Sequence, residues 1–158
     1  MKSRRAFALI AAIVITGCGV KSLPVPPERA MPERIASLEA TSQRNGVMLE
    51  WEKPDRTAGG SRLNDLGSFE VDRADDIGPY KKLGLVLVTD QDRFQQQHRY
   101  NYLDGGVQVG HRYRYQVIST TLDHYRSDPS NEAALTHKIP APPPNPEDFV
   151  IPQPKPLP

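Results

Sequence analysis

The residues of this 158-residue chain that could carry chemistry are one cysteine, Cys18, and four histidines. A lone cysteine cannot form a disulfide within its own chain, and it cannot supply a zinc site built from several cysteines. The histidines are thirteen residues apart, which is not the spacing of metal ligands on one element; they are His98, His111, His124 and His137. We therefore expect four separate surface histidines and no metal site.

Two acidic stretches, "DRADD" at 72–76 and "TDQD" at 89–92, raise the question of calcium. Both lack the glycine and the distal glutamate of an EF-hand loop, so neither predicts a calcium site. The sequence also lacks a Gly-x-Ser-x-Gly motif, a glycine-rich phosphate loop and a recognisable pair of nucleophile and base. We expect a non-enzyme, without catalytic residues, a cofactor or a small-molecule substrate.

Cys18 follows a segment that is typical of a secretory signal. Three basic residues within positions 2–5 precede an apolar run at 6–16, which has about half of the ~20 residues that a membrane-spanning helix needs. The quartet "ITGC" at 15–18 resembles the lipobox of bacterial lipoproteins. That resemblance implies cleavage just before Cys18 and acylation of its sulfur, with 1–17 as the signal peptide. The alternative is an ordinary signal peptide with a chance cysteine nearby.

The lipobox resemblance predicts a membrane anchor on Cys18. Stable attachment needs more than one acyl chain, and the diacylglycerol and amide-linked acyl group that the resemblance implies meet that need. Residue 19 is Gly rather than Asp, which by the sorting rule of enterobacterial lipoproteins favours the outer membrane, facing the periplasm. Loss of 1–17 removes three of the 20 basic side chains and none of the 19 acidic ones, which changes the net charge from +1 to −2. This balance argues against a nucleic-acid partner.

Proline divides the chain into a centre and two arms. Residues 18–32 hold the lipidated cysteine and a proline-rich tether, and residues 141–158 form a proline-rich tail. Such compositions favour extended, disordered chain rather than a packed core. The apolar island "EDFVI" around Phe149 makes the tail either a recognition peptide or a spacer.

The centre, residues 33–140, alternates apolar and polar residues with a period of two, which is typical of strands rather than helices. Glycine-, proline- and aspartate-containing turns separate the alternating segments. The pattern predicts seven strands, within 34–43, 46–54, 68–76, 80–88, 98–104, 111–120 and 131–139. Seven short strands in about a hundred residues indicate an all-β, immunoglobulin-like antiparallel sandwich.

The same segment resembles the fibronectin type III domain. Trp51 lies in the second expected strand, and Phe69, Val71 and Arg73 form an aromatic-x-Val-x-Arg strand. The stretch "YLDGGVQVGHRYRYQVIST" at 102–120 is similar to the family's Asp-x-x-Val-x-x-Gly-x-x-Tyr-x-Tyr-x-Val signature, and "SDPSNEA" at 127–133 is similar to its entry to the last strand. The resemblance covers nearly all of the central segment.

Several packing expectations follow from this arrangement. Trp51 should pack between the two sheets, and Tyr113 should form a tyrosine corner whose hydroxyl bonds to the backbone near Val107. The remaining core should come from Leu49, Phe69, Val71, Leu85, Tyr115 and Val117. In the family, the strands around 70 and 114 are neighbours. We therefore expect cross-strand ion pairs of Glu70 and Asp72 with Arg112 and Arg114.

The sequence favours a membrane-anchored interaction module whose partner is another envelope protein. Loops at 59–66 and 123–129 and the tail would carry the contacts, with Arg62, Tyr125 and Phe149 as candidate residues. The alternative is a lipoprotein that binds carbohydrate or peptidoglycan. That function needs exposed aromatic side chains, for which Tyr80, Tyr100, Tyr102 and Tyr125 are the candidates.

Overall fold

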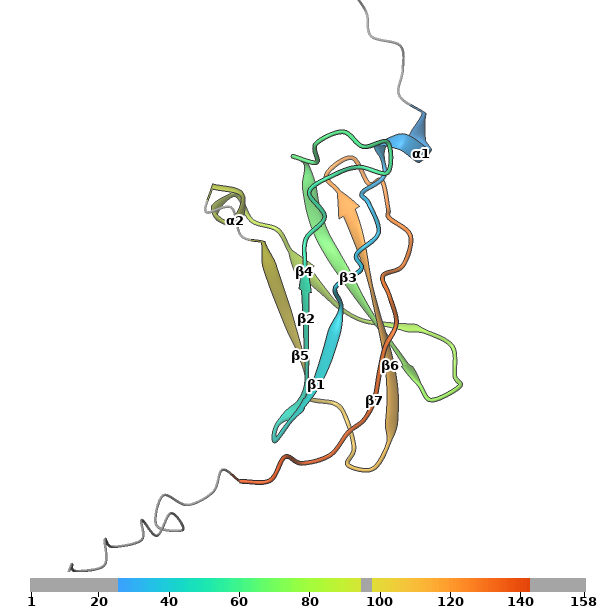
Figure 1. Ribbon diagram of the computed structural model, residues 1–158, viewed down its shortest axis with the longest axis vertical. Helices are drawn as coiled ribbons and strands as arrows, with labels where there is room; N and C mark the ends of the chain where they lie inside the picture. The colour runs from blue at the N-terminus through green and yellow to red at the C-terminus, as the bar shows by residue number, and fades with distance from the viewer. Residues whose placement is uncertain (1–25, 95–97, 143–158) are drawn as a thin grey trace, which may run out of the picture.

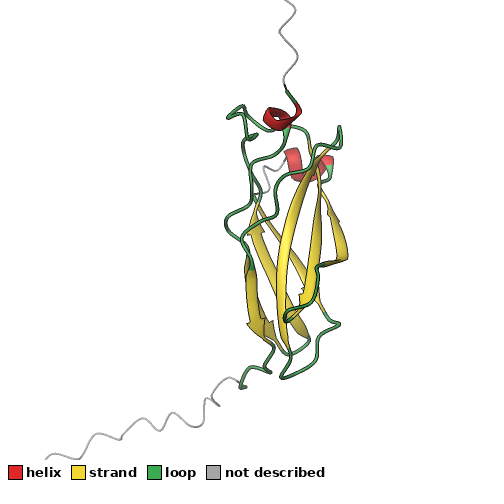
Figure 2. Cartoon of the chain, turned by 90° about the vertical axis from the view of Figure 1, so that its right-hand side faces the viewer, coloured by secondary structure: helices red, strands yellow, loops and turns green. Residues whose placement is uncertain are grey.

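The computed structural model of the chain describes residues 26–94 and 98–142, and Figures 1 and 2 show two sheets packed face to face. The smaller sheet has the order β1 (Glu39–Gln43), β2 (Gly46–Glu52), β5 (Arg99–Asp104). The larger sheet has the order β4 (Lys81–Leu87), β3 (Leu66–Asp75), β6 (Arg112–Thr121), β7 (Ala133–Thr136). All pairs are antiparallel. The predicted all-β sandwich of seven strands is confirmed.

Within residues 26–94 and 98–142, helix is confined to two short pieces, α1 (Pro27–Ala30) and α2 (Asp90–Phe94). Neither they nor any other helix in the described part of the chain is long and apolar enough to cross a membrane. Cys18 and Phe149 lie outside the described residues.

The core lies between the sheets and follows the period-two alternation. On β2, the side chains of Val47, Leu49 and Trp51 are buried while those of Glu50 and Glu52 are exposed. Aromatic residues of both sheets meet there: the Trp51 and Phe69 rings have centroids 5.4 Å apart at an interplanar angle of 72°, and Phe69 and Tyr100 lie 4.7 Å apart. The other buried side chains at the centre include Val71, Tyr113, Tyr115 and Val117. Edge-to-face contacts of this kind add to the apolar area that is buried.

The chain packs onto the sandwich before its first strand begins. Ile35 and Leu38 are both buried. The backbone of Leu38 is bound in both directions by the Asn131 side chain, which accepts from its N–H at 2.9 Å and donates to its carbonyl at 2.8 Å. The chain enters at one end of the sandwich, where α1 lies, and leaves after β7 at the other end (Figure 2).

Leu85 is not a core residue, contrary to the sequence-based expectation. The side chain of Leu85 on β4 is 49% exposed, whereas Leu83 and Val86 pack against the core. The cause is a β-bulge: Val71 pairs with Gly84 and Asp72 with Lys82, so Leu83 is an extra residue on β4. An extra residue inverts the alternation of the strand beyond it.

Candidate interaction surfaces

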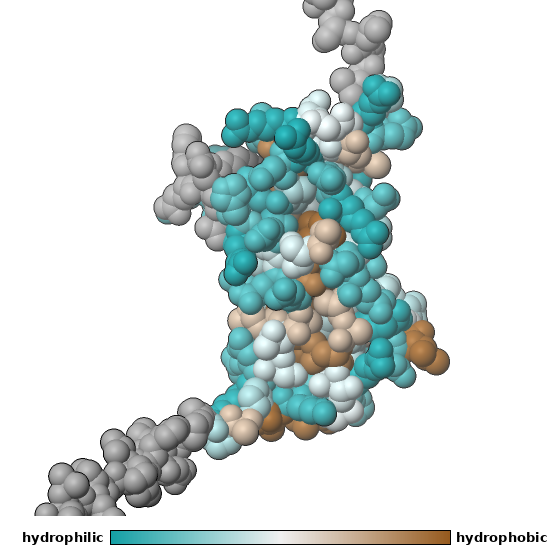
Figure 3. All heavy atoms as spheres, viewed as in Figure 1, coloured by the Kyte–Doolittle hydropathy of each residue, from teal (hydrophilic) through white to brown (hydrophobic). Residues whose placement is uncertain are grey.

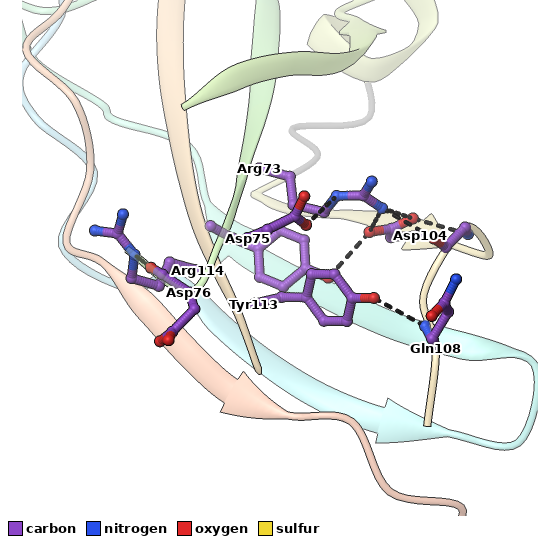
Figure 4. Close-up of polar contacts among 9 residues, drawn as sticks. Arg73, Asp75, Asp76, Asp104, Gln108, Tyr113 and Arg114 are labelled. Carbon is purple, nitrogen blue, oxygen red and sulfur yellow. Dashed lines mark hydrogen bonds and ion pairs between the residues drawn. The ribbon is translucent and has the colours of Figure 1, made fainter. Parts of the chain in front are cut away.

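A buried carboxylate joins the two sheets. Asp104, at the end of β5, is 2% exposed and accepts hydrogen bonds from Arg73 of β3, at 3.0 and 3.2 Å, and from the Tyr115 hydroxyl of β6, at 3.0 Å. The backbone N–H of Gly106 donates to it at 2.9 Å. Figure 4 shows the guanidinium of Arg73 directed at the Asp104 carboxylate. Burial and the negative charge of Asp104 raise the pKa of Tyr115 above its ordinary range. Because the carboxylate is saturated and buried, this cluster acts as a structural clamp.

Tyr113 lies beside the clamp and closes the β5–β6 connection. The backbone N–H of Gln108 donates to the Tyr113 hydroxyl at 2.9 Å, one residue beyond the position expected for the corner (Figure 4). The guanidinium of Arg73 lies over the Tyr113 ring, 5.2 Å from its centroid, which is a favourable position for a cation. The clamp and the corner together fix Arg73 on two sides.

The alternation of inward and outward residues along β3 and β5 indicates this clamp, although no role was predicted for Asp104. Asp104 is in phase with the buried Tyr100, and Arg73 is in phase with the buried Phe69 and Val71. A charged residue at an inward position must find a partner, since an unpaired buried charge is costly. Opposite charges on inward positions of two different sheets are therefore a detectable signal.

The predicted ion pairs on the outer face of the larger sheet are wrong in their partners. Glu70 binds Arg126, at 2.6 Å, and Lys82, at 3.0 Å. Asp72 accepts from the Gln116 amide at 3.0 Å. The register explains the difference, because Glu70 lies opposite Ile118 and Asp72 opposite Gln116, which leaves Arg112 and Arg114 further along the sheet.

Arg112 and Arg114 bind the β3–β4 connection instead. Arg112 pairs with Asp76 at 3.8 Å. Arg114 donates to the carbonyl of Asp76 (Figure 4). It also donates to the carbonyl of Gly78 and pairs with Glu132 at 3.0 Å. These contacts hold the turn beside β6.

Tyr80 belongs to the same cluster. Its hydroxyl donates to Glu132 at 2.5 Å, and its ring lies 5.0 Å from the guanidinium carbon of Arg114. Burial, followed by the hydrogen bond to Glu132, raises the pKa of Tyr80 from 10.0 to about 12. Because the folded state favours the protonated phenol, this contribution to stability is complete below pH 10 and is lost as the pH rises towards 12.

We predict that the difference in tyrosinate absorbance between the natural chain and Tyr80→Phe will show a transition near pH 12. In a Glu132→Gln background this transition should move towards pH 10, since the charged acceptor is gone. Tyr125→Phe is the control, because Tyr125 is exposed. A Tyr80 transition at the ordinary pH would contradict the arrangement.

Two loops meet at the end of the sandwich where the chain enters. The β6–β7 connection exposes Leu122 and Tyr125, and the Leu122 N–H donates to the backbone carbonyl of Asp65 in the β2–β3 connection at 2.8 Å. Thr121 closes the turn: its N–H donates to the Tyr125 carbonyl and its hydroxyl accepts from the Tyr125 N–H, both at 3.0 Å. His124 has a φ of 66°, the left-handed conformation that a tight turn uses. We call residues 121–125, with the exposed side chains of Leu122 and Tyr125, the apolar turn.

Arg62 lies in the neighbouring β2–β3 connection and is exposed. It lines an open cleft of about 470 Å³ with the basic side chains of Lys53 and Arg56. Asp55 in the same cleft pairs with Lys53 at 3.5 Å and lies 3.8 Å from His98. The structure thus brings two of the predicted contact residues, Arg62 and Tyr125, to one end of the molecule.

The other predicted features are distributed differently. His137 is buried beside Ser42, with 3.3 Å between Nδ1 and Oγ, so the expectation of four surface histidines is wrong for this one. Among residues 26–94 and 98–142, no group of three or more His, Cys, Asp or Glu side chains could hold a metal ion. Tyr100 is buried and Tyr80 and Tyr102 are partly buried. Tyr125 is therefore the exposed member of the four candidate tyrosines.

Exposed apolar side chains do not merge into one large patch on the face seen in Figure 3. This face is mainly hydrophilic, with a hydrophobic projection at the β3–β4 turn, where Ile77 is exposed. The exposed large hydrophobic residues include Ile77, Leu85, Leu87, Leu103, Val109, Leu122, Tyr125 and Ile139.

Comparison with known proteins gives structural likenesses only. No protein-family model matches the chain, and no curated protein matches it. A Fn3-like protein from Clostridium thermocellum is 23% identical with a TM-score of 0.46, over 72% of this chain and 98% of that one. Titin module A71 from human cardiac muscle is 19% identical with a TM-score of 0.48, over 66% and 90%.

A β-1,2-glucanase from Parabacteroides distasonis is 18% identical with a TM-score of 0.48, over 69% of this chain. The chain spans only 13% of the length of that glucanase. The strand order in the two sheets and the tyrosine corner at Tyr113 define the fold. These features give the chain a seven-stranded sandwich of the fibronectin type III kind.

Proposed function

We propose that this chain is a non-enzymatic lipoprotein of the bacterial cell envelope, whose sandwich binds another envelope protein. The anchor is the acylated Cys18, and residues 18–32 are the tether. Gly19, which follows the anchor, favours the outer membrane. The observation that carries the binding function is the apolar turn. Leu122 and Tyr125 are exposed on a loop that its own hydrogen bonds hold in one conformation.

A pre-ordered apolar loop is suited to protein recognition. Little conformational entropy is lost when such a loop binds, and aromatic side chains are frequent anchors of protein interfaces. Arg62 lies on the adjacent loop, and arginine is also enriched in such anchors. The cleft beside it carries both acidic and basic side chains, which favours a partner with mixed charge over a nucleic acid.

Carbohydrate binding receives no comparable support. A sugar-binding surface needs aromatic rings that are free to stack. Three of the four candidate tyrosines are engaged elsewhere, which leaves Tyr125 as the exposed one. Tyr100 packs on Phe69, Tyr102 lies between the sheets against Gly84, and Tyr80 binds Glu132.

The lipid anchor is tested by labelling growing cells with a fatty acid that carries a clickable group. The natural chain should take up the label, and Cys18→Ser should lose it completely because the acceptor sulfur is absent. Gly17→Ala is the control, since it keeps a small residue before the cleavage point. Equal labelling of the natural chain and Cys18→Ser would contradict the lipoprotein assignment.

The partner is tested by photocrosslinking in cells, with photoreactive residues at Arg62, Tyr125 and Phe149. We expect a discrete protein adduct at Tyr125, and the same position in a Leu122→Asp background should give much less. A photoreactive residue at Ile139, which is exposed beyond β7 at the other end, is the control. Adducts to glycan alone, or none at any of the three sites, would contradict the proposal.

A further inference from the structure

We propose that the chain self-associates through the free edge of β4, which pairs antiparallel with β4 of a second copy. This inference goes beyond the proposed function, because it concerns a different surface and does not depend on the lipid anchor or on the apolar turn. β4 is the end strand of the larger sheet and pairs with β3. Among the described residues, no strand pairs with its other side.

The backbone of β4 is oriented for such pairing. Val88, just after the strand, donates its N–H to the carbonyl of Gly67 at 2.9 Å, so its polar groups face β3. In an antiparallel pair the residues alternate between facing the neighbour and facing away. The N–H and C=O groups of Leu87 and Leu85 therefore point to the free edge.

The two halves of β4 are protected differently. The first half carries Lys81 and Lys82 and ends in the bulge at Leu83, and charges and bulges are the features that prevent edge-to-edge pairing. The second half, 84–89, contains neither a charge nor a proline. Within this half, Leu85 and Leu87 are 49% and 63% exposed on the outer face of the sheet. An unprotected apolar edge of this kind is a template for another strand.

The charges around this edge identify the second strand as another β4. Basic residues, Lys81 and Lys82, precede the apolar segment, and acidic residues, Asp90 and Asp92, follow it in the first turn of α2. An antiparallel strand with the same sequence brings its acidic end beside the basic end of the first. The pattern is thus complementary to itself, whereas a partner with uniform charge would match only one end.

One register satisfies both the backbone and the side chains. With a two-fold axis at Val86, Leu85 of each copy lies opposite Leu87 of the other, and both residues direct their backbone groups to the new ladder. The same register brings the basic end of β4 in one copy, at Lys82, towards the start of α2 in the other copy, where Asp90 lies. Lys82 already pairs with Glu70 at 3.0 Å with its side chain 54% exposed, so it can approach a second carboxylate. The result is an eight-stranded sheet across an isologous dimer.

The first test measures the mass of the full-length chain in detergent by sedimentation at increasing concentration. The natural chain should show a monomer–dimer equilibrium. Leu87→Lys should raise the dissociation constant about tenfold or more. The two-fold symmetry places two new charges in the interface, one from each copy, and each lies opposite the apolar Leu85 of the other copy. Ile139→Lys is the matched control: Ile139 is 58% exposed and lies beyond β7, so dimerisation should be unchanged. Circular dichroism verifies that both variants are folded.

The second test addresses the register. Lys82→Glu and Asp90→Lys, each alone, should weaken dimerisation, because like charges then face each other in both copies. Mixing the two variants with different affinity tags should restore a dimer that contains one of each, since that pair has Glu opposite Lys and Lys opposite Asp. A mixture that associates no better than either variant alone would overturn this register.

Three outcomes would overturn the inference as a whole: a natural chain that remains monomeric at every concentration, a dimer that Leu87→Lys leaves intact, or a β4 edge that captures a different protein while the chain stays monomeric. None of them bears on the crosslink expected at Tyr125. Conversely, loss of that crosslink would contradict the proposed function and leave the β4 dimer standing.

Discussion

Replacing Asp104 with alanine should lower the free energy of unfolding by about 3 kcal/mol, the lower end of the cost of breaking a buried ion pair. The substitution removes the acceptor of both Arg73 and the Tyr115 hydroxyl. Tyr115 is fully buried and would keep an unsatisfied hydroxyl. Arg73 retains some contact with solvent, which is why the lower end is expected. Urea unfolding followed by circular dichroism measures the difference.

Asp75→Ala is the matched control for this prediction. Asp75 also pairs with Arg73, but at 3.9 Å and with a side chain that is 77% exposed. An exposed pair contributes under about 1 kcal/mol, so Asp75→Ala should have almost no effect. Asp104→Asn should fall between the two, since it keeps one acceptor oxygen and loses the charge. If Asp104→Ala cost no more than Asp75→Ala, the clamp would not hold the sheets together.

Trp51→Ala should destabilise the sandwich by about 3–5 kcal/mol, the range found when a large buried aromatic residue is removed. Trp51 is among the largest fully buried side chains of the molecule and packs edge-on against Phe69. Its removal leaves a cavity between two sheets whose strands are tied by antiparallel ladders, so the walls cannot collapse freely. Thermal and urea unfolding by circular dichroism measure the loss.

Trp51→Phe separates packing from hydrogen bonding. The Trp51 Nε1 is buried without a hydrogen-bond partner among the described residues, so phenylalanine gives up volume and no hydrogen bond. We expect a cost well below that of alanine. Tyr125→Ala, which removes an exposed aromatic residue, should change stability by less than about 1 kcal/mol. Equal costs for Trp51→Ala and Tyr125→Ala would contradict the central role of Trp51.

The strands could be predicted because their apolar residues alternate without interruption over the buried face. Val47, Leu49 and Trp51 on β2 are an example. Leu85 could not be placed in the same way, because the bulge at Leu83 shifts the phase and depends on the pairing with β3 rather than on β4 alone. The tyrosine corner was predictable to within one residue, since the spacing of Tyr113 from its loop is local in the sequence.

The contacts on the molecular surface were harder to predict from the sequence than the fold. Cross-strand partners depend on register, which differs from the expected one by a few residues. Arg112 and Arg114 were the predicted partners of Glu70, whereas its partners in the structure are Arg126 and Lys82. Arg62 and Tyr125 come from loops about sixty residues apart in the chain. The hydrogen bond between Leu122 and Asp65 that brings these loops together is a tertiary contact that no local pattern encodes.

The entry and exit of the chain at opposite ends of the sandwich have a mechanical consequence (Figure 2). Tension applied between residues 26 and 142, the two ends of the described chain, would act nearly parallel to the strands. Antiparallel hydrogen bonds run perpendicular to the strands, so such a pull shears many of them at once rather than opening them one after another. The sandwich should therefore resist a pull between these two ends more strongly than a pull across its sheets.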